Sequence, residues 1–115
     1  MNVIKELQEW FVAQCNGQWE HRLGISITTC DNPGWIVNID LNETNLINRN
    51  FKLNSRNVSQ KLIDQSLGKI KPPLMAENPT SDNWMICFVK DGKFTGVGDT
   101  HRLEDILMVF VNWAK

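Results

Sequence analysis

Two short segments in which apolar and polar residues alternate constrain the fold of this chain most. They read GISITT and GWIVNIDL, and the turn sequence Asp-Asn-Pro-Gly lies where they meet. Alternation with a period of two is typical of a half-buried β-strand. Asp, Asn, Pro and Gly each favour a reversal of the chain, for different reasons. The sequence therefore predicts a β-hairpin over residues 24–42.

A second hairpin is predicted nearer the C-terminus. The apolar segments WMICFV and KFTGVG flank Asp91-Gly92, a dipeptide strongly favoured in tight hairpin turns. Gly96 and Gly98 leave one face of the second strand without side chains. We expect another part of the structure, either the final helix or a ligand, to pack closely there.

Helical spacing of apolar residues predicts amphipathic helices over residues 3–15 and 101–114. Asn2 is expected to cap the first helix, and Asp99 or Thr100 the second. Between the hairpins, NFKLN is compatible with a third strand and SQKLIDQSL with a short helix or an irregular loop. The order of elements predicts an α+β fold, in which a small antiparallel sheet built from two hairpins carries an N-terminal and a C-terminal helix.

Length and composition bound the class of protein. A chain of 115 residues can build its own core, so we expect a single domain over residues 1–115. A net charge of −1 argues against non-specific nucleic-acid binding, which needs a basic face. The locally basic block at residues 51–76 is expected to be a solvated loop face.

The cysteines and the length of the apolar segments indicate the cellular compartment in which the protein is expected. The three cysteines lack the C-x2-C spacing of zinc sites, and we expect them to be reduced. No signal-peptide run and no apolar stretch of membrane-spanning length is found. We therefore expect a cytoplasmic protein that has no membrane partner and no cofactor.

Catalytic and metal-binding interpretations find little support in the sequence. His21 follows Glu20, but adjacent side chains on a strand point to opposite faces, so adjacency does not make a catalytic pair. No nucleophile motif accompanies them. A metal site built from His21, His101 and Asp31 with a cysteine matches no known spacing. We therefore expect neither catalytic nor metal-binding residues.

An interface is the better interpretation of the segment from Cys15 to Trp35. We expect Trp35 to pack in the core, while Trp19 lies outside the periodic segments and is the better candidate for an exposed anchor. Turn stabilisation is the simpler explanation for the Asp and Asn of the hairpin turn. The candidate binding residues are Trp19, Glu20, His21, Arg22, Asp31 and Asn32.

Three segments of the chain resemble the immunity protein 53 family of bacterial polymorphic-toxin systems: LQEWF, CNGQWEHRLGISITTCDNPGWIVNIDL and DGKFTGVGD…LEDILMVFVNWA. They fall within residues 7–41 and 84–114, and residues 43–83 carry little recognisable pattern. The resemblance implies a cytosolic protein that neutralises a cognate toxin and has no catalytic activity. The family's motif positions fall on Trp19, Glu20, His21, Gly24, Asp31, Asn32, Pro33, Gly34, Trp35 and Asp40.

We therefore expect an immunity protein, either a monomer or a homodimer, that binds its cognate toxin domain and blocks it by occlusion. The alternative is a small enzyme or ligand-binding protein with a pocket formed by Glu20, His21 and Asp31. Close approach of these residues around a concave site would favour that alternative, and a solitary His21 on the surface would count against it. A third interpretation is a scaffold subunit that pairs through an exposed sheet edge.

Overall fold

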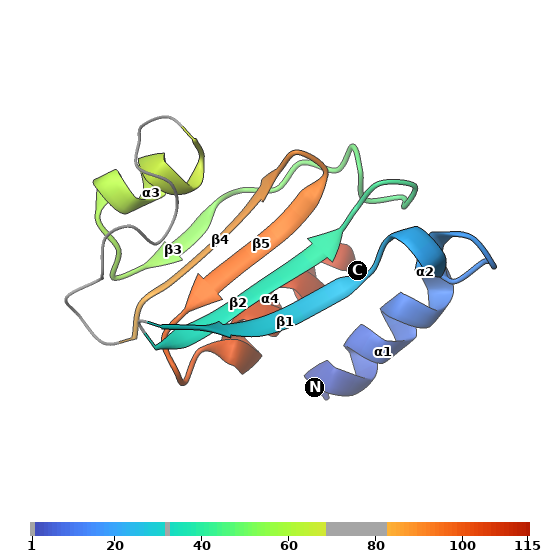
Figure 1. Ribbon diagram of the computed structural model, residues 1–115, viewed down its shortest axis with the longest axis horizontal. Helices are drawn as coiled ribbons and strands as arrows, with labels where there is room; N and C mark the ends of the chain where they lie inside the picture. Colours follow the sequence, from blue (N-terminus) through green and yellow to red (C-terminus); the bar gives the residue numbers. More distant parts are fainter. Residues whose placement is uncertain (1, 32, 69–82) are drawn as a thin grey trace.

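A computed structural model describes residues 2–31, 33–68 and 83–115 of the chain. Figure 1 shows a twisted sheet with the C-terminal helix behind it, the N-terminal helix beyond one edge, and short helices at either side. The elements in chain order are α1 (Val3–Gln14), α2 (Trp19–Arg22), β1 (Ile25–Cys30), β2 (Gly34–Asp40), β3 (Asn54–Arg56), α3 (Gln60–Ser66), β4 (Met85–Lys90), β5 (Lys93–Gly98) and α4 (Leu103–Ala114).

The sheet is antiparallel throughout, with the strand order β1-β2-β5-β4-β3. Its two hairpins are β1–β2 and β4–β5, and they join through the pairing of β2 with β5 in the middle of the sheet. This confirms the predicted α+β fold with two hairpins and a helix from each end of the chain. NFKLN was compatible with a third strand, and the third strand begins at its last residue, Asn54, and pairs with β4.

The two faces of the sheet are packed differently. Val37 and Ile39 of β2, together with Phe94 of β5, belong to the large core that α1 and α4 cover. Aromatic edge-to-face contacts continue this core, such as Phe94 with Phe110 of α4 at 5.2 Å between ring centroids. The other face has a smaller cluster in which Ile86 and its neighbours pack against side chains of α3.

The glycines of β5 explain how closely α4 lies on the sheet. A Cβ built on Gly96 would collide with Cγ2 of Ile106, and one on Gly98 would lie 2.8 Å from Cβ of Arg102. Real Cβ atoms do not come this close, so any larger residue at these positions would force α4 or its side chains to shift. The bare face predicted for β5 is therefore the docking surface of α4, and the expectation that the final helix packs there is confirmed.

The caps of the two long helices differ from each other. The side chain of Asn2 accepts a hydrogen bond from Lys5 N at 3.0 Å, which confirms the predicted cap of α1. The predicted cap of α4 is wrong, because Arg102 occupies the cap position and makes no capping hydrogen bond. The carboxylate of Asp99 accepts from His101 N at 2.8 Å instead. Asp99 therefore closes the turn before the helix, a competing local bond that short acidic side chains readily make.

The segment between the hairpins is partly helical. SQKLIDQSL forms α3, and the hydroxyl of Ser59 accepts from Leu62 N at 3.1 Å as the cap. The part of the uncertain region at residues 69–82 lies outside the described residues. Within the described ranges, none of the helices combines the length and the apolar character that a membrane crossing requires.

Candidate functional site

The expectation that Trp19 is an exposed anchor is wrong. Its side chain is 1% exposed, and its ring lies edge-on against Trp10 and Phe11 with centroids 6.1 and 6.0 Å away. Its Nε1–H donates to the carbonyl oxygen of Asn42 at 2.9 Å. A short helix that the hydrophobic periodicity did not reveal, α2, turns the ring inward. Trp19 therefore joins α1, α2 and the loop after β2.

Glu20 also has a structural position. Its two carboxylate oxygens accept from Asn16 N at 2.9 Å and Gly17 N at 2.8 Å. The pKa of Glu20 is lowered, first by the hydrogen bond from its own backbone amide and then by those from these two amides, with burial opposing. The ionised carboxylate thus closes the loop between α1 and α2.

The remaining predicted residues divide between two places. His21 and Arg22 are exposed on α2, and Arg22 Nη2 lies 2.7 Å from Glu43 Oε2 in a surface ion pair. Asp31 is exposed in the turn after β1, and the predicted contact Asn32 lies outside the described residues. The structure therefore places exposed candidates at both ends of β1.

The alternative pocket of Glu20, His21 and Asp31 is not formed. Six residues of β1 separate α2 from the turn that carries Asp31, and at about 3.3 Å per residue this strand is roughly 20 Å long. Among the described residues, no group of three or more His, Cys, Asp or Glu side chains is arranged to hold a metal ion. His21 is exposed on its helix, the arrangement that counts against the enzyme alternative.

The three free cysteines were considered as possible catalytic nucleophiles. Cys15 is exposed, Cys30 is half-buried and Cys87 is buried. Burial raises the pKa of the Cys87 thiol to about 12. Because the thiolate is the nucleophilic form, Cys87 is a core residue without nucleophilic character at neutral pH.

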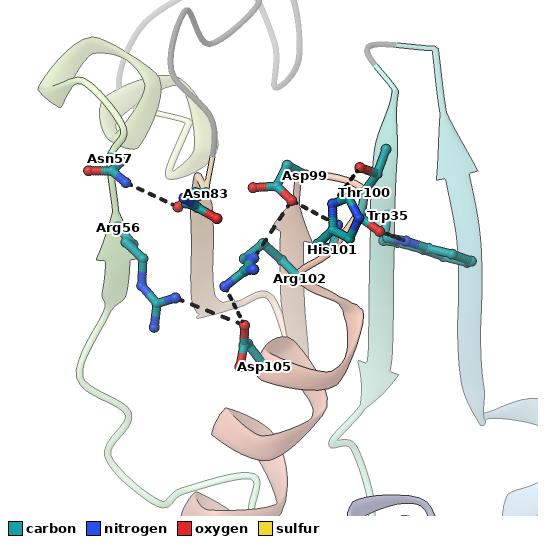
Figure 2. A network of polar contacts seen from close by, with 9 residues as sticks. All are labelled: Trp35, Arg56, Asn57, Asn83, Asp99, Thr100, His101, Arg102 and Asp105. Atoms are coloured by element: carbon teal, nitrogen blue, oxygen red, sulfur yellow. Dashed lines mark hydrogen bonds and ion pairs between the residues drawn. The ribbon is translucent and has the colours of Figure 1, made fainter.

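Figure 2 shows a chain of ion pairs at the junction of β5 and α4. Arg102 lies at its centre: Nη1 donates to Asp105 Oδ2 at 2.7 Å, and Nε lies 3.6 Å from Asp99 Oδ1. Asp105 also lies 3.9 Å from Arg56 Nη1 on β3. The chain therefore fastens the first turn of α4 to both the end of β5 and the edge strand β3.

Trp35 is fastened to the same junction. Its Nε1–H donates to the carbonyl oxygen of Thr100 at 3.1 Å (Figure 2). Trp35, which was expected to pack in the core, lies on the same face of β2 as the core residue Val37. Its ring is half-buried rather than fully in the core, because it lies at the end of β2 opposite Gly98.

A groove of about 440 Å³ lies between α4 and β3. Lys52, Arg56 and Asp105 contribute its charges, while Met108 and Trp113 are among its apolar residues. Asp105 and Arg56 are already engaged in the ion pairs at the head of α4. This groove combines charged and apolar side chains, as binding sites often do.

A second surface follows β1 and is more apolar. Four large apolar side chains are prominently exposed within the described ranges. Three of them lie on α1 or β1, namely Ile4 (52%), Val12 (66%) and Ile27 (41%). Between these elements lies a groove of about 250 Å³ lined by Leu7, Gln8, Phe11 and Ile25. We call this side of the molecule, formed by α1 and the outer edge of β1, the β1 surface.

The β1 surface was not predicted from the sequence, although a signal was present. Ile4, Phe11 and Cys15 follow the same helical spacing over residues 3–15 as the residues that face the core. In the structure Val3 and Leu7 face the core, and Ile4 is displaced from it by one position. The apolar residues of α1 cover more of the helix surface than one buried face can hold, which indicates that some of them are exposed. His21, Arg22 and Asp31 then flank an apolar centre, because α2 precedes β1 and the hairpin turn follows it.

The sequence model of one protein family, described as immunity protein 53, matches residues 4–115. No curated protein and no solved structure matches the chain.

Proposed function

This chain belongs to the immunity protein 53 family, and we propose that it neutralises its cognate toxin by binding the toxin domain through the β1 surface and occluding it. Membership of an immunity family implies toxin neutralisation. The direct binding, the surface and the blocking mechanism are our proposal, as is action in the cytoplasm.

The exposed apolar side chains of the β1 surface carry this proposal. Exposed apolar side chains that border an apolar groove often mark a binding surface, and α1 and β1 form such a groove between Phe11 and Ile25. The apolar side chains of Ile4, Val12 and Ile27 are exposed to solvent in the free protein. His21 and Arg22 at one end of β1, and Asp31 at the other, supply a polar rim of the kind that surrounds the apolar centre of an interface.

The demands of immunity set the scale of the interaction. Stable interfaces between proteins bury on the order of 1,600 Å² in total. Protection from an enzyme requires tight binding, on the order of nanomolar or about −12 kcal/mol. The net charge of −1 gives the surface no resemblance to nucleic acid. Apolar contact, rather than charge mimicry, is therefore the main source of affinity in this proposal.

The test is a calorimetric titration of this protein against the toxin domain encoded beside its gene, together with an assay of the toxin's activity. We expect one-to-one binding and loss of toxin activity. Val12→Lys should weaken binding about tenfold or more, because a charge replaces an apolar contact. Lysine is a good helix former, so α1 should be preserved.

Lys52→Ala is the matched control, because Lys52 lies in the groove between α4 and β3. It should leave the dissociation constant unchanged. Loss of binding in Lys52→Ala with full binding in Val12→Lys would move the interface to that groove. A folded protein that neither binds nor inhibits the toxin would refute the proposed function.

A further inference from the structure

The backbone of β1 presents a regular row of hydrogen-bonding groups that have no partner in the part of the chain that the structure describes. Asp40 N donates to Gly24 O at 3.0 Å, which makes these two residues a hydrogen-bonded pair of the β1–β2 ladder. Such pairs alternate along an antiparallel ladder, so Ser26 and Thr28 also bond to β2. The amide and carbonyl groups of Ile25, Ile27 and Thr29 therefore point away from β2, toward the outer edge of the sheet.

The described residues of β1 itself carry none of the features that usually prevent strand pairing. β1 is six residues long and contains neither a charged residue nor a proline. Natural edge strands are commonly shortened, charged, bulged or covered for that reason. At the opposite edge, β3 has only three residues, and its Arg56 is charged. The contrast within one sheet indicates that the β1 edge is kept open for a partner.

Helix α1 lies over the space into which an added strand would fit. In the face-on view of Figure 1, α1 lies beyond the outer edge of β1, in the helical layer behind the sheet. The groove between Phe11 of α1 and Ile25 of β1 follows this overhang. An added strand would point every second side chain into the groove, beside Ile27. A helix that flanks an open strand edge is a geometry suited to extended peptides.

We propose that an extended segment of the toxin pairs with β1 as a sixth strand and inserts apolar side chains beneath α1. The inference rests on the proposed function and specifies how the β1 surface is used. The groove residues are apolar except for Gln8, and β1 carries no charge. The matching segment is therefore uncharged where it pairs, with branched apolar residues at alternate positions.

A second copy of this chain is a poorer occupant than a peptide segment. Antiparallel β1–β1 pairing about a two-fold axis would bring the partner's α1 over the same edge, because each α1 overhangs its own β1. Paired strands lie about 4.8 Å apart, whereas helix axes need about 8–10 Å. The overhanging helices would therefore meet before the strands could pair.

The test is amide hydrogen exchange, followed residue by residue in the whole protein, alone and bound to the toxin domain. In the free protein Ser26 and Thr28 should exchange slowly, and Ile25, Ile27 and Thr29 quickly. Binding should slow the second group at least about tenfold, since each amide gains a backbone partner. Protection of the second group in the free protein that rises with its concentration would indicate self-pairing and overturn the inference.

Two further outcomes separate this inference from the proposed function. Tight toxin binding with unchanged exchange at Ile25, Ile27 and Thr29 would overturn strand addition and leave the immunity function intact. Absence of any binding by the folded protein would contradict both proposals.

Substitutions at one position provide an independent check. Ile27→Pro removes an outward amide, a change that an edge strand tolerates on its free side, and should weaken toxin binding at least about tenfold. Ile27→Ala keeps the amide and should lose less. Thr28→Ala, on the other face of the same strand, is the control and should bind normally. Equal losses in the two Ile27 variants would show that only the side chain matters, and would refute strand addition.

Discussion

Replacement of Trp19 distinguishes a structural role from a binding role. This residue was predicted to be exposed, but its side chain is buried in the structure. Trp19 is 1% exposed, packs edge-on against Trp10 and Phe11, and bonds through its indole N–H to the carbonyl of Asn42. Trp19→Ala removes all of these contacts and leaves a cavity. Trp19→Phe keeps an aromatic ring but removes the hydrogen bond.

The magnitudes follow from these contacts. Truncation of a buried tryptophan to alanine costs about 3–5 kcal/mol of unfolding free energy. Trp19→Phe should cost about 1–2 kcal/mol, from the lost hydrogen bond and the smaller buried area. Against a total stability of about 5–15 kcal/mol, Trp19→Phe remains folded, while Trp19→Ala approaches the limit of stability.

Urea unfolding followed by circular dichroism measures both losses, and a toxin-binding titration of Trp19→Phe completes the test. We expect a lower unfolding midpoint and an unchanged dissociation constant. If Trp19→Ala retained the stability of the parent protein while losing toxin affinity, Trp19 would be a surface contact. The burial argument would then be refuted.

Two other predictions concern the packing of α4 and the loop after α1. Gly96→Ala should cost about 1–3 kcal/mol of stability because its methyl group meets Cγ2 of Ile106. Combination with Ile106→Leu, which lacks a β-branch, should recover part of that loss in urea unfolding, and strict additivity would disprove the clash. The lowered pKa of Glu20 means that its ionised carboxylate stabilises the fold above about pH 4.5. Its contribution is lost as pH falls below that value, so the stability difference between the parent and Glu20→Gln should shrink in acid, and a pH-independent difference would contradict it.

Much of the sheet was predictable because its signals are local. Alternation along 24–42 and the Asp91-Gly92 turn each specify a hairpin from neighbouring residues alone. The bare glycine face of β5 predicted close packing by the final helix or a ligand, and in the structure the final helix packs there. These features depend on the chain's own period and turn chemistry, which a sequence displays directly.

The candidate site was less predictable because it depends on burial. Trp19 belongs to no segment with helical or strand periodicity. The neighbouring sequence therefore does not show that α2 points its ring inward toward Trp10. Exposure of Ile27 follows from the position of β1 at the end of the strand order, a property of the whole sheet. Residues that look alike in an alternating segment can therefore be buried in one strand and exposed in the next.

The pairing of β2 with β5 also has a kinetic consequence. Each hairpin can form from residues close in sequence, but Asp40 and Lys93, which face each other across the central ladder, lie about fifty residues apart. Closing a loop of that length costs entropy before any central contact repays it. Neither hairpin encloses the large core alone, since α4 docks on β5 and the core includes Val37 and Ile39 of β2. We therefore expect the two halves to associate late, in one cooperative step that sets the folding rate.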